Sequence, residues 1–115
     1  MKSITKILVA ATFLMMLSGF QIIKTQLTAT VRNELGNIEE GVKVQLFETE
    51  ADYLAETNVA AEGYTDKKGN VKFKDLKAIA YYIIARKEDK DNAGGGEQTG
   101  KLEPNRINKV TIVIQ

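Results

Sequence analysis

The chain has 115 residues, of which 43% are hydrophobic and 27% are charged, and its formal net charge is +1. This composition predicts one folded domain and excludes a globally disordered chain and a strongly basic nucleic-acid binder. Cysteine and histidine are both absent. Their absence excludes disulfides, thiol chemistry and a lipidated cysteine, and it removes the usual protein ligands of zinc.

Residues 1–21 predict a secretory signal peptide. Two lysines precede an apolar run over residues 7–17, and Ser18 and Gly19 follow this run. The apolar run is shorter than the roughly 20 residues that a membrane-spanning helix needs. We therefore expect an N-terminal signal helix that ends between residues 19 and 24. It would precede a single domain over residues 22–115 of a secreted or periplasmic bacterial protein, with no permanent membrane insertion.

Alternating apolar and polar residues predict several short β-strands in the remaining chain, because successive side chains of a strand point to opposite faces. The alternating segments are residues 27–32, 42–46, 71–74 and 110–115. The continuous apolar run at residues 79–85 predicts a central strand that is covered on both sides. Residues 58–65 form a further, less regular strand candidate.

The connections between these strands contain typical turn residues. Residues 33–37 and 66–70 each combine a side-chain oxygen with a glycine, which predicts hairpin or near-hairpin turns. Residues 48–57 form a longer connection, in which residues 50–55 predict one helical turn. The longest connection covers residues 88–106, and loops of this length are usually functional or mobile. Short strands and regular turns without a long helix predict an antiparallel β-sandwich.

Three segments resemble carboxypeptidase regulatory-like domains. Residues 31–46 resemble the opening strand of that family, its D-x-x-G-x-P turn and the x-G-A-x-V-x-L that follows. Residues 64–76 resemble T-D-x-x-G-x-F-x-F-x-x-L, and residues 82–85 stand where the Y-x-V-x-A strand belongs. The resemblance covers residues 25–87. It implies an all-β, seven-strand, Greek-key sandwich of the transthyretin (prealbumin)-like class, which B-type repeats of collagen adhesins share.

The chain departs from this family at informative positions. Ile38 stands where proline is usual, and Arg86 stands where adhesin repeats place the acid that assists an internal isopeptide bond. We therefore expect no isopeptide. Transthyretin-like hydroxyisourate hydrolases need histidines and a C-terminal Tyr-Arg-Gly-Ser motif, whereas this chain ends with Thr-Ile-Val-Ile-Gln, so that activity is not expected either.

The residue types present form no recognisable catalytic constellation. The serines are confined to Ser3 and Ser18, inside the predicted signal peptide, so the mature chain would hold no Ser, Cys or His nucleophile or base. We expect no enzyme and no cofactor. Glu39 and Glu40 form an acidic pair beside a glycine, and we interpret them as solvated turn charges.

The segment around Asp89 partly matches a calcium-binding loop. Asp89, Asp91 and Gly94 occupy positions one, three and six of such a loop, but Ala93 and Gly100 depart from it at positions five and twelve. A polar loop is therefore favoured over a calcium site.

We expect a non-catalytic exported module with a structural or protein-interaction role, whose partner is an unknown protein at the cell envelope. The first alternative is a small-ligand or carbohydrate-binding domain, and the second is a hydrolase. An exposed edge strand would also support a dimer. The basic stripe of Lys67, Lys68, Lys72 and Lys74 is interpreted as a solvated face. The candidate interaction residues lie in the two long connections, and they are Tyr53, Asp91, Asn92, Gly94, Gly95 and Gly96.

Overall fold

The computed structural model describes residues 23–115, so the expected signal helix lies outside the described residues. Strands dominate the described part, and one short helix, α2 (Glu50–Ala55), accompanies them. No helix within residues 23–115 is long and apolar enough to cross a membrane. The strands are β1 (Gln26–Asn33), β2 (Lys43–Phe47), β3 (Ala61–Tyr64), β4 (Asn70–Phe73), β5 (Ala80–Lys87), β6 (Lys90–Asp91), β7 (Gln98–Lys101) and β8 (Ile107–Ile114).

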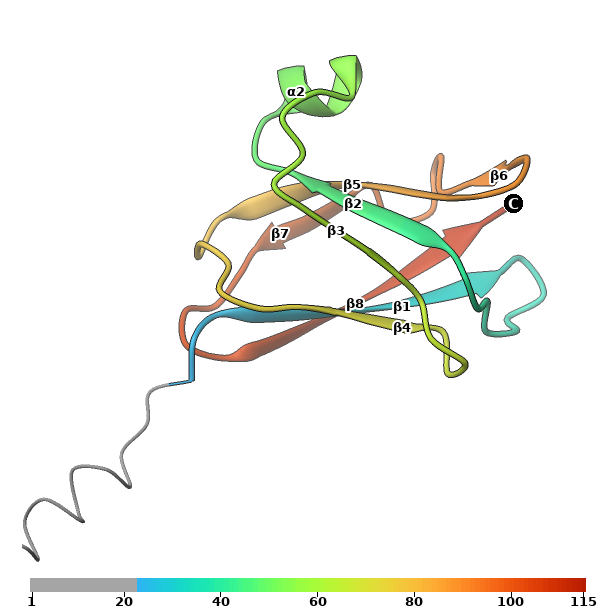
Figure 1. Ribbon diagram of the computed structural model, residues 1–115, viewed down its shortest axis with the longest axis horizontal. Helices are drawn as coiled ribbons and strands as arrows, with labels where there is room; N and C mark the ends of the chain where they lie inside the picture. The colour runs from blue at the N-terminus through green and yellow to red at the C-terminus, as the bar shows by residue number, and fades with distance from the viewer. Residues whose placement is uncertain (1–22) are drawn as a thin grey trace, which may run out of the picture.

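The strands form two sheets, as expected for a β-sandwich (Figure 1). One sheet has the order β4-β1-β8, and the other has the order β3-β2-β5-β6, with β7 also paired to β5. The expectation of a purely antiparallel sandwich is wrong for one pair, because β1 and β8 run parallel from Gln26↔Ile107 to Asn33↔Ile114. A parallel pair needs a crossover connection, and here the chain between β1 and β8, which includes the whole second sheet, provides it.

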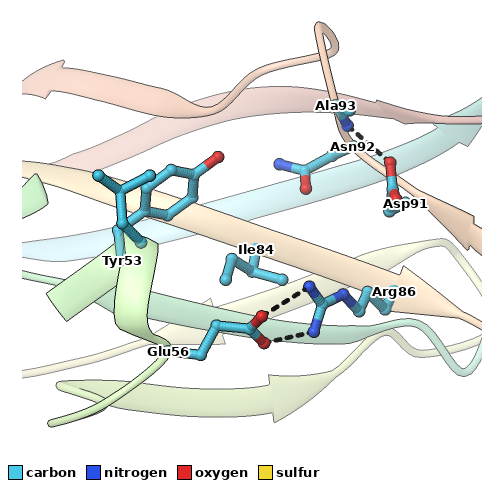
Figure 2. Close-up of a pocket in the computed structure, with 8 residues that line it drawn as sticks. Tyr53, Glu56, Ile84, Arg86, Asp91, Asn92 and Ala93 are labelled. Carbon is cyan, nitrogen blue, oxygen red and sulfur yellow. Dashed lines mark hydrogen bonds and ion pairs between the residues drawn. The ribbon is translucent and has the colours of Figure 1, made fainter. Parts of the chain in front are cut away.

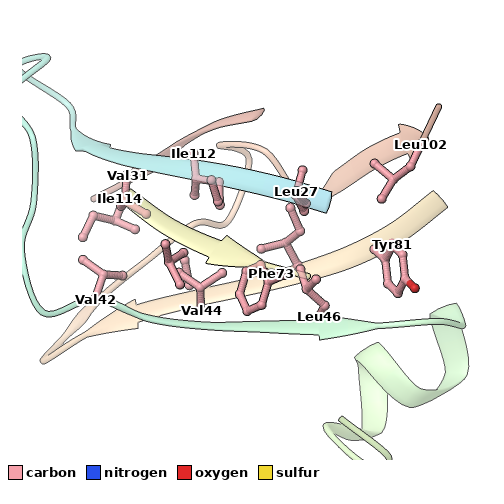
Figure 3. Close-up of a cluster of buried hydrophobic side chains, with 14 residues drawn as sticks. Leu27, Val31, Val42, Val44, Leu46, Phe73, Tyr81, Leu102, Ile112 and Ile114 are labelled. Carbon is pink, nitrogen blue, oxygen red and sulfur yellow. The ribbon is translucent and has the colours of Figure 1, made fainter. Parts of the chain in front are cut away.

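The core lies between the sheets and follows the period of two that the sequence predicts (Figure 3). In each strand that faces the core, every second side chain is apolar and points inward. Each fully buried aliphatic or aromatic side chain stabilises the fold by roughly 1.5–3 kcal/mol. Tyr81 joins this core with 2% of its surface exposed, and its hydroxyl accepts a hydrogen bond from the Lys77 backbone N–H at 3.0 Å. Other buried members are Leu27, Ala29, Val31, Val42, Val44, Leu46, Val71, Phe73, Ile83, Ala85, Leu102, Ile112 and Ile114.

A second apolar cluster lies on the outer face of the five-stranded sheet. Phe47 and Ile84 are buried there, although neither belongs to the core between the sheets. The ring of Tyr53, on α2, packs against Phe47 with a centroid distance of 6.2 Å and against Tyr82 with a distance of 5.6 Å. The helix therefore covers part of β5, so the prediction that the apolar run is covered on both sides is confirmed at Ile84, while Ala80 and Tyr82 on the same face are half-buried.

The long connection over residues 88–106 is more structured than the sequence suggested. It contains β6 and β7, which bring the described strands to eight instead of seven. Asn92 is 4% exposed, and its side chain bonds to the backbone of Ala85, Ile83 and Gly96 at 3.0–3.1 Å. The expectation of one long loop is therefore wrong. A buried side-chain amide and two short strands, neither of which shows an apolar alternation, fix this segment to β5.

Candidate functional site

A pocket of about 220 Å³ lies on the outer face of β5, between the end of α2 and the segment that follows β6 (Figure 2). It brings together residues that are up to 40 positions apart in the sequence. The lining residues are Tyr53, Leu54, Glu56, Ile84, Arg86, Asp91, Asn92 and Ala93.

The α2 wall of the pocket is fixed at both ends of the helix. The Thr49 hydroxyl caps the start of α2 by accepting a hydrogen bond from the Asp52 backbone N–H at 3.1 Å. Glu56 ends the helix in the left-handed conformation with φ 54°. Two neighbouring rings hold Tyr53, and burial raises the pKa of its hydroxyl above the ordinary value. The negative charge of Glu97 adds to this increase in pKa.

Arg86 and Glu56 form a two-point ion pair along one side of the pocket. Both guanidinium Nη atoms donate to the two carboxylate oxygens, with Nη2 and Oε2 separated by 3.0 Å. This contact lowers the pKa of the Glu56 carboxyl and raises the pKa of Arg86. Both groups therefore stay ionised at neutral pH. The pair is about half exposed, so it can rearrange to meet a binding partner at small energetic cost.

The opposite wall consists of Asp91, Asn92 and Ala93. The Asp91 carboxylate accepts a hydrogen bond from the Ala93 backbone N–H at 2.9 Å, and Figure 2 shows this contact across the pocket from Tyr53. Within this wall the Asn92 side chain is buried and anchors the segment to β5. The wall thus presents one carboxylate, that of Asp91, to the pocket.

Three of the six predicted interaction residues, Tyr53, Asp91 and Asn92, meet at this pocket. The glycines do not line it. Gly94 donates its backbone N–H to Glu97 Oε1 at 2.9 Å, and the Gly95 carbonyl accepts from the Val113 backbone N–H at 2.8 Å. Gly96 lies against Thr111 and Ile112. Gly95 and Gly96 let the segment pack closely on β8.

Sequence reasoning missed five lining residues, Leu54, Glu56, Ile84, Arg86 and Ala93. The Glu56–Arg86 pair joins residues 30 positions apart, and no local pattern connects them. Arg86 did stand out as a departure from the related family, at the polar end of an apolar run. The presence of arginine in place of the family's acid was the sequence feature that could have pointed to Arg86 as a site residue.

The other acidic candidates lie elsewhere or act differently. Glu39 is not a solvated turn charge, because its side chain is only 14% exposed and its carboxylate forms ion pairs with Lys87 at 3.2 Å and Lys90 at 3.8 Å. The hydrogen bond from Lys87 lowers the pKa of Glu39. Within residues 23–115, no three acidic side chains gather closely enough to hold a metal ion together. The polar loop that the sequence favours over a calcium site at Asp89 and Asp91 stays a prediction.

Comparisons with known proteins identify the class of fold. No family model matches the chain, and no curated protein matches it. A streptococcal ancillary pilin has a similar structure, with a TM-score of 0.55 and 19% identity over 81% of this chain and 32% of the pilin chain. The group B streptococcus pilus 2b backbone protein is similar with a TM-score of 0.53 and 17% identity, over 79% of this chain and 40% of that chain.

At these identities the similarity shows the fold alone. The described chain is a two-sheet β-sandwich of the kind found as part of these pilus proteins, and it spans well under half the length of either one.

Proposed function

We propose that this chain is an exported, non-catalytic β-sandwich module with a structural or protein-interaction role at the cell envelope. The observation that carries the proposal is the shared fold with parts of an ancillary pilin and a pilus backbone protein. The sequence supports export through the signal-peptide pattern of residues 1–21. The resemblance to carboxypeptidase regulatory-like domains supports a prealbumin-like Greek key as the finer fold.

The pocket between α2 and the segment after β6 is the contact surface in this proposal. Tyrosine and arginine are enriched where proteins bind one another, because they combine large contact area with directed hydrogen bonds. Tyr53 and Arg86 supply these two side chains, and Leu54, 70% exposed, adds an apolar contact at the rim. A partner segment that places an apolar side chain beside Leu54 and a polar group at Arg86 would fit this surface.

A quantitative pull-down from the native envelope fraction tests this role. The mature domain carries Leu54→Lys in one sample and Leu35→Lys in the other, because Leu35 is 83% exposed in a turn outside the pocket. We expect Leu54→Lys to remove a specific protein that both the wild type and Leu35→Lys retain. Equal capture by all three proteins would contradict the pocket as the contact surface.

A small-ligand or carbohydrate site is the second candidate function, and the concave shape of the pocket favours it. Its volume of about 220 Å³ lies slightly below the usual range of about 300–1,000 Å³ for ligand pockets. The Tyr53 hydroxyl and the Asp91 carboxylate could hold the hydroxyls of one sugar. Titration with monosaccharides, followed by NMR shifts of the Asp91–Ala93 amides, separates this candidate from a protein-binding role. Saturable shifts support it, and unchanged spectra eliminate it.

A further inference from the structure

The outer face of the three-stranded sheet forms a second surface, which we call the basic face. Side chains at alternate positions of β1, β4 and β8 point away from the core. In Figure 1 these three strands form one layer, and the five-stranded sheet covers its other side. The basic face consists of Gln26, Thr28, Thr30, Arg32, Asn70, Lys72, Ile107, Lys109, Thr111 and Val113.

The charges on this face all have one sign. All fifteen acidic residues of the chain lie within residues 23–115, and none lies in β1, β4 or β8. Arg32, Lys72 and Lys109 form no ion pair in the part of the chain that the structure describes. By contrast, Lys43 and Arg86 on the opposite sheet each pair with a glutamate.

Neighbouring lysines extend this positive region. Lys74 directly follows β4, and Lys67 and Lys68 lie in the turn that leads into it. Asp66 shares this turn, and its carboxylate, which accepts hydrogen bonds from the backbone N–H groups of Lys68 and Asn70 at 2.9 and 3.0 Å, keeps one negative charge near Lys68 and Lys72. The basic face is therefore positive, although residues 23–115 carry one more acidic than basic side chain.

The strand register sets the spacing of the cations. Thr28 pairs with Lys72 of β4 on one side and with Lys109 of β8 on the other. Adjacent strands lie about 4.8 Å apart, so the backbone positions of the two lysines are about 10 Å apart. This distance is close to the Debye length of about 8 Å at physiological ionic strength, so salt only partly screens an anion near one lysine from the charge of the other. An anion that lies along the face interacts with several cations at once.

We propose that the basic face binds a polyanionic polysaccharide. An extended polymer can meet cations spread over three strands, whereas a small ligand prefers a concave site. The face carries no aromatic side chain to anchor a protein partner. Ile107 and Val113 are its apolar members, too few for insertion into a lipid surface. The hydroxyls of Thr28 and Thr111 lie beside the cations, where they can bond to sugar hydroxyls.

This proposal is independent of the pocket, because the two surfaces belong to different sheets. The test measures heparin binding to the mature domain over a series of salt concentrations, with neutral dextran and phosphatidylglycerol vesicles as separate probes. The variant Lys72→Gln/Lys109→Gln removes two charges from the basic face. The matched control Lys43→Gln/Lys101→Gln removes two charges from the opposite sheet, and thermal unfolding verifies that both variants fold.

We expect the wild type to bind heparin and not dextran, with an affinity that falls as salt rises because bound counterions are released. The variant in the basic face should bind at least tenfold more weakly at low salt. It should also lower the slope of log K against log salt by about 2, which is one unit per lost contact. Equal weakening in the control variant, equal binding of dextran, or binding to vesicles without heparin binding would each overturn the proposal.

Discussion

At the scale of single residues, the Asn92 side chain makes hydrogen bonds to backbone groups of the kind that a paired strand would make. Its side chain donates to the carbonyls of Ile83 and Gly96 and accepts from the Ala85 backbone N–H, and all of these contacts lie in or near the buried interior. Removing the amide leaves buried backbone groups without partners, and each such group costs about 1–3 kcal/mol.

We therefore predict that Asn92→Ala lowers the free energy of unfolding by about 3 kcal/mol, measured by urea denaturation. Asn37→Ala is the matched control, because Asn37 is exposed. It should change the free energy by less than about 0.5 kcal/mol. Equal effects of the two substitutions would show that Asn92 does not anchor the segment.

The Glu56–Arg86 ion pair should make the stability of the fold depend on pH. The hydrogen bonds from Arg86 lower the pKa of the folded Glu56 carboxyl below its ordinary value of 4.5. The contribution of the pair to stability is therefore complete above pH 4.5 and is lost as the pH falls through the lower folded pKa. An NMR titration of the Glu56 carboxyl should show a midpoint below 4.5. In Arg86→Gln the midpoint should return toward 4.5, and an unchanged midpoint would mean that the pair does not persist in solution.

At the scale of elements, the glycines after β6 control how closely this segment approaches β8. A Cβ atom at Gly95 would overlap the backbone oxygen of Val113, whereas a Cβ at Gly94 meets nothing within 4 Å. Gly94 has φ +73°, so alanine there costs about 1 kcal/mol of backbone strain alone.

We predict that Gly95→Ala destabilises the fold more than Gly94→Ala does and detaches the segment from β8. Hydrogen exchange at the Val113 amide, which donates to the Gly95 carbonyl, measures this directly. Protection at Val113 should fall in Gly95→Ala and remain in Gly94→Ala. Full protection in both variants would contradict close packing at Gly95.

The sequence predicted the elements wherever burial leaves a local pattern. The alternation at residues 27–32 and 71–74 lies within β1 and at β4, and the helical turn at residues 50–55 is α2. β6 and β7 were missed because they are short, polar and close to glycines, and their pairing with β5 depends on tertiary contacts. The parallel direction of β8 was missed for a related reason. The alternation of apolar and polar residues shows which face of a strand is buried, but it does not show which strand lies beside it or in which direction that strand runs.

At the scale of the whole molecule, the two sheets present different outer surfaces. The five-stranded sheet carries the pocket with Tyr53 and the Glu56–Arg86 pair, and the three-stranded sheet carries the basic face. Tyr53 and Asp91 stand out in the sequence as residues of the two long connections, but only the fold shows that they meet at one pocket. From the sequence, the lysines near β4 can be interpreted only as a solvated stripe. Arg32 on β1 and Lys109 on β8 become their neighbours only when the three strands pair in one sheet.

We propose that the pocket between α2 and the segment after β6 contacts a protein at the cell envelope. Photo-crosslinking in living cells tests it most directly, with the crosslinking side chain at Ala93 on the pocket rim. Tyr64, which is 62% exposed on β3 and outside the pocket, is the control position. We predict a discrete protein adduct from position 93 and none of that size from position 64. No adduct at position 93, or the same adducts at both positions, would contradict the claim.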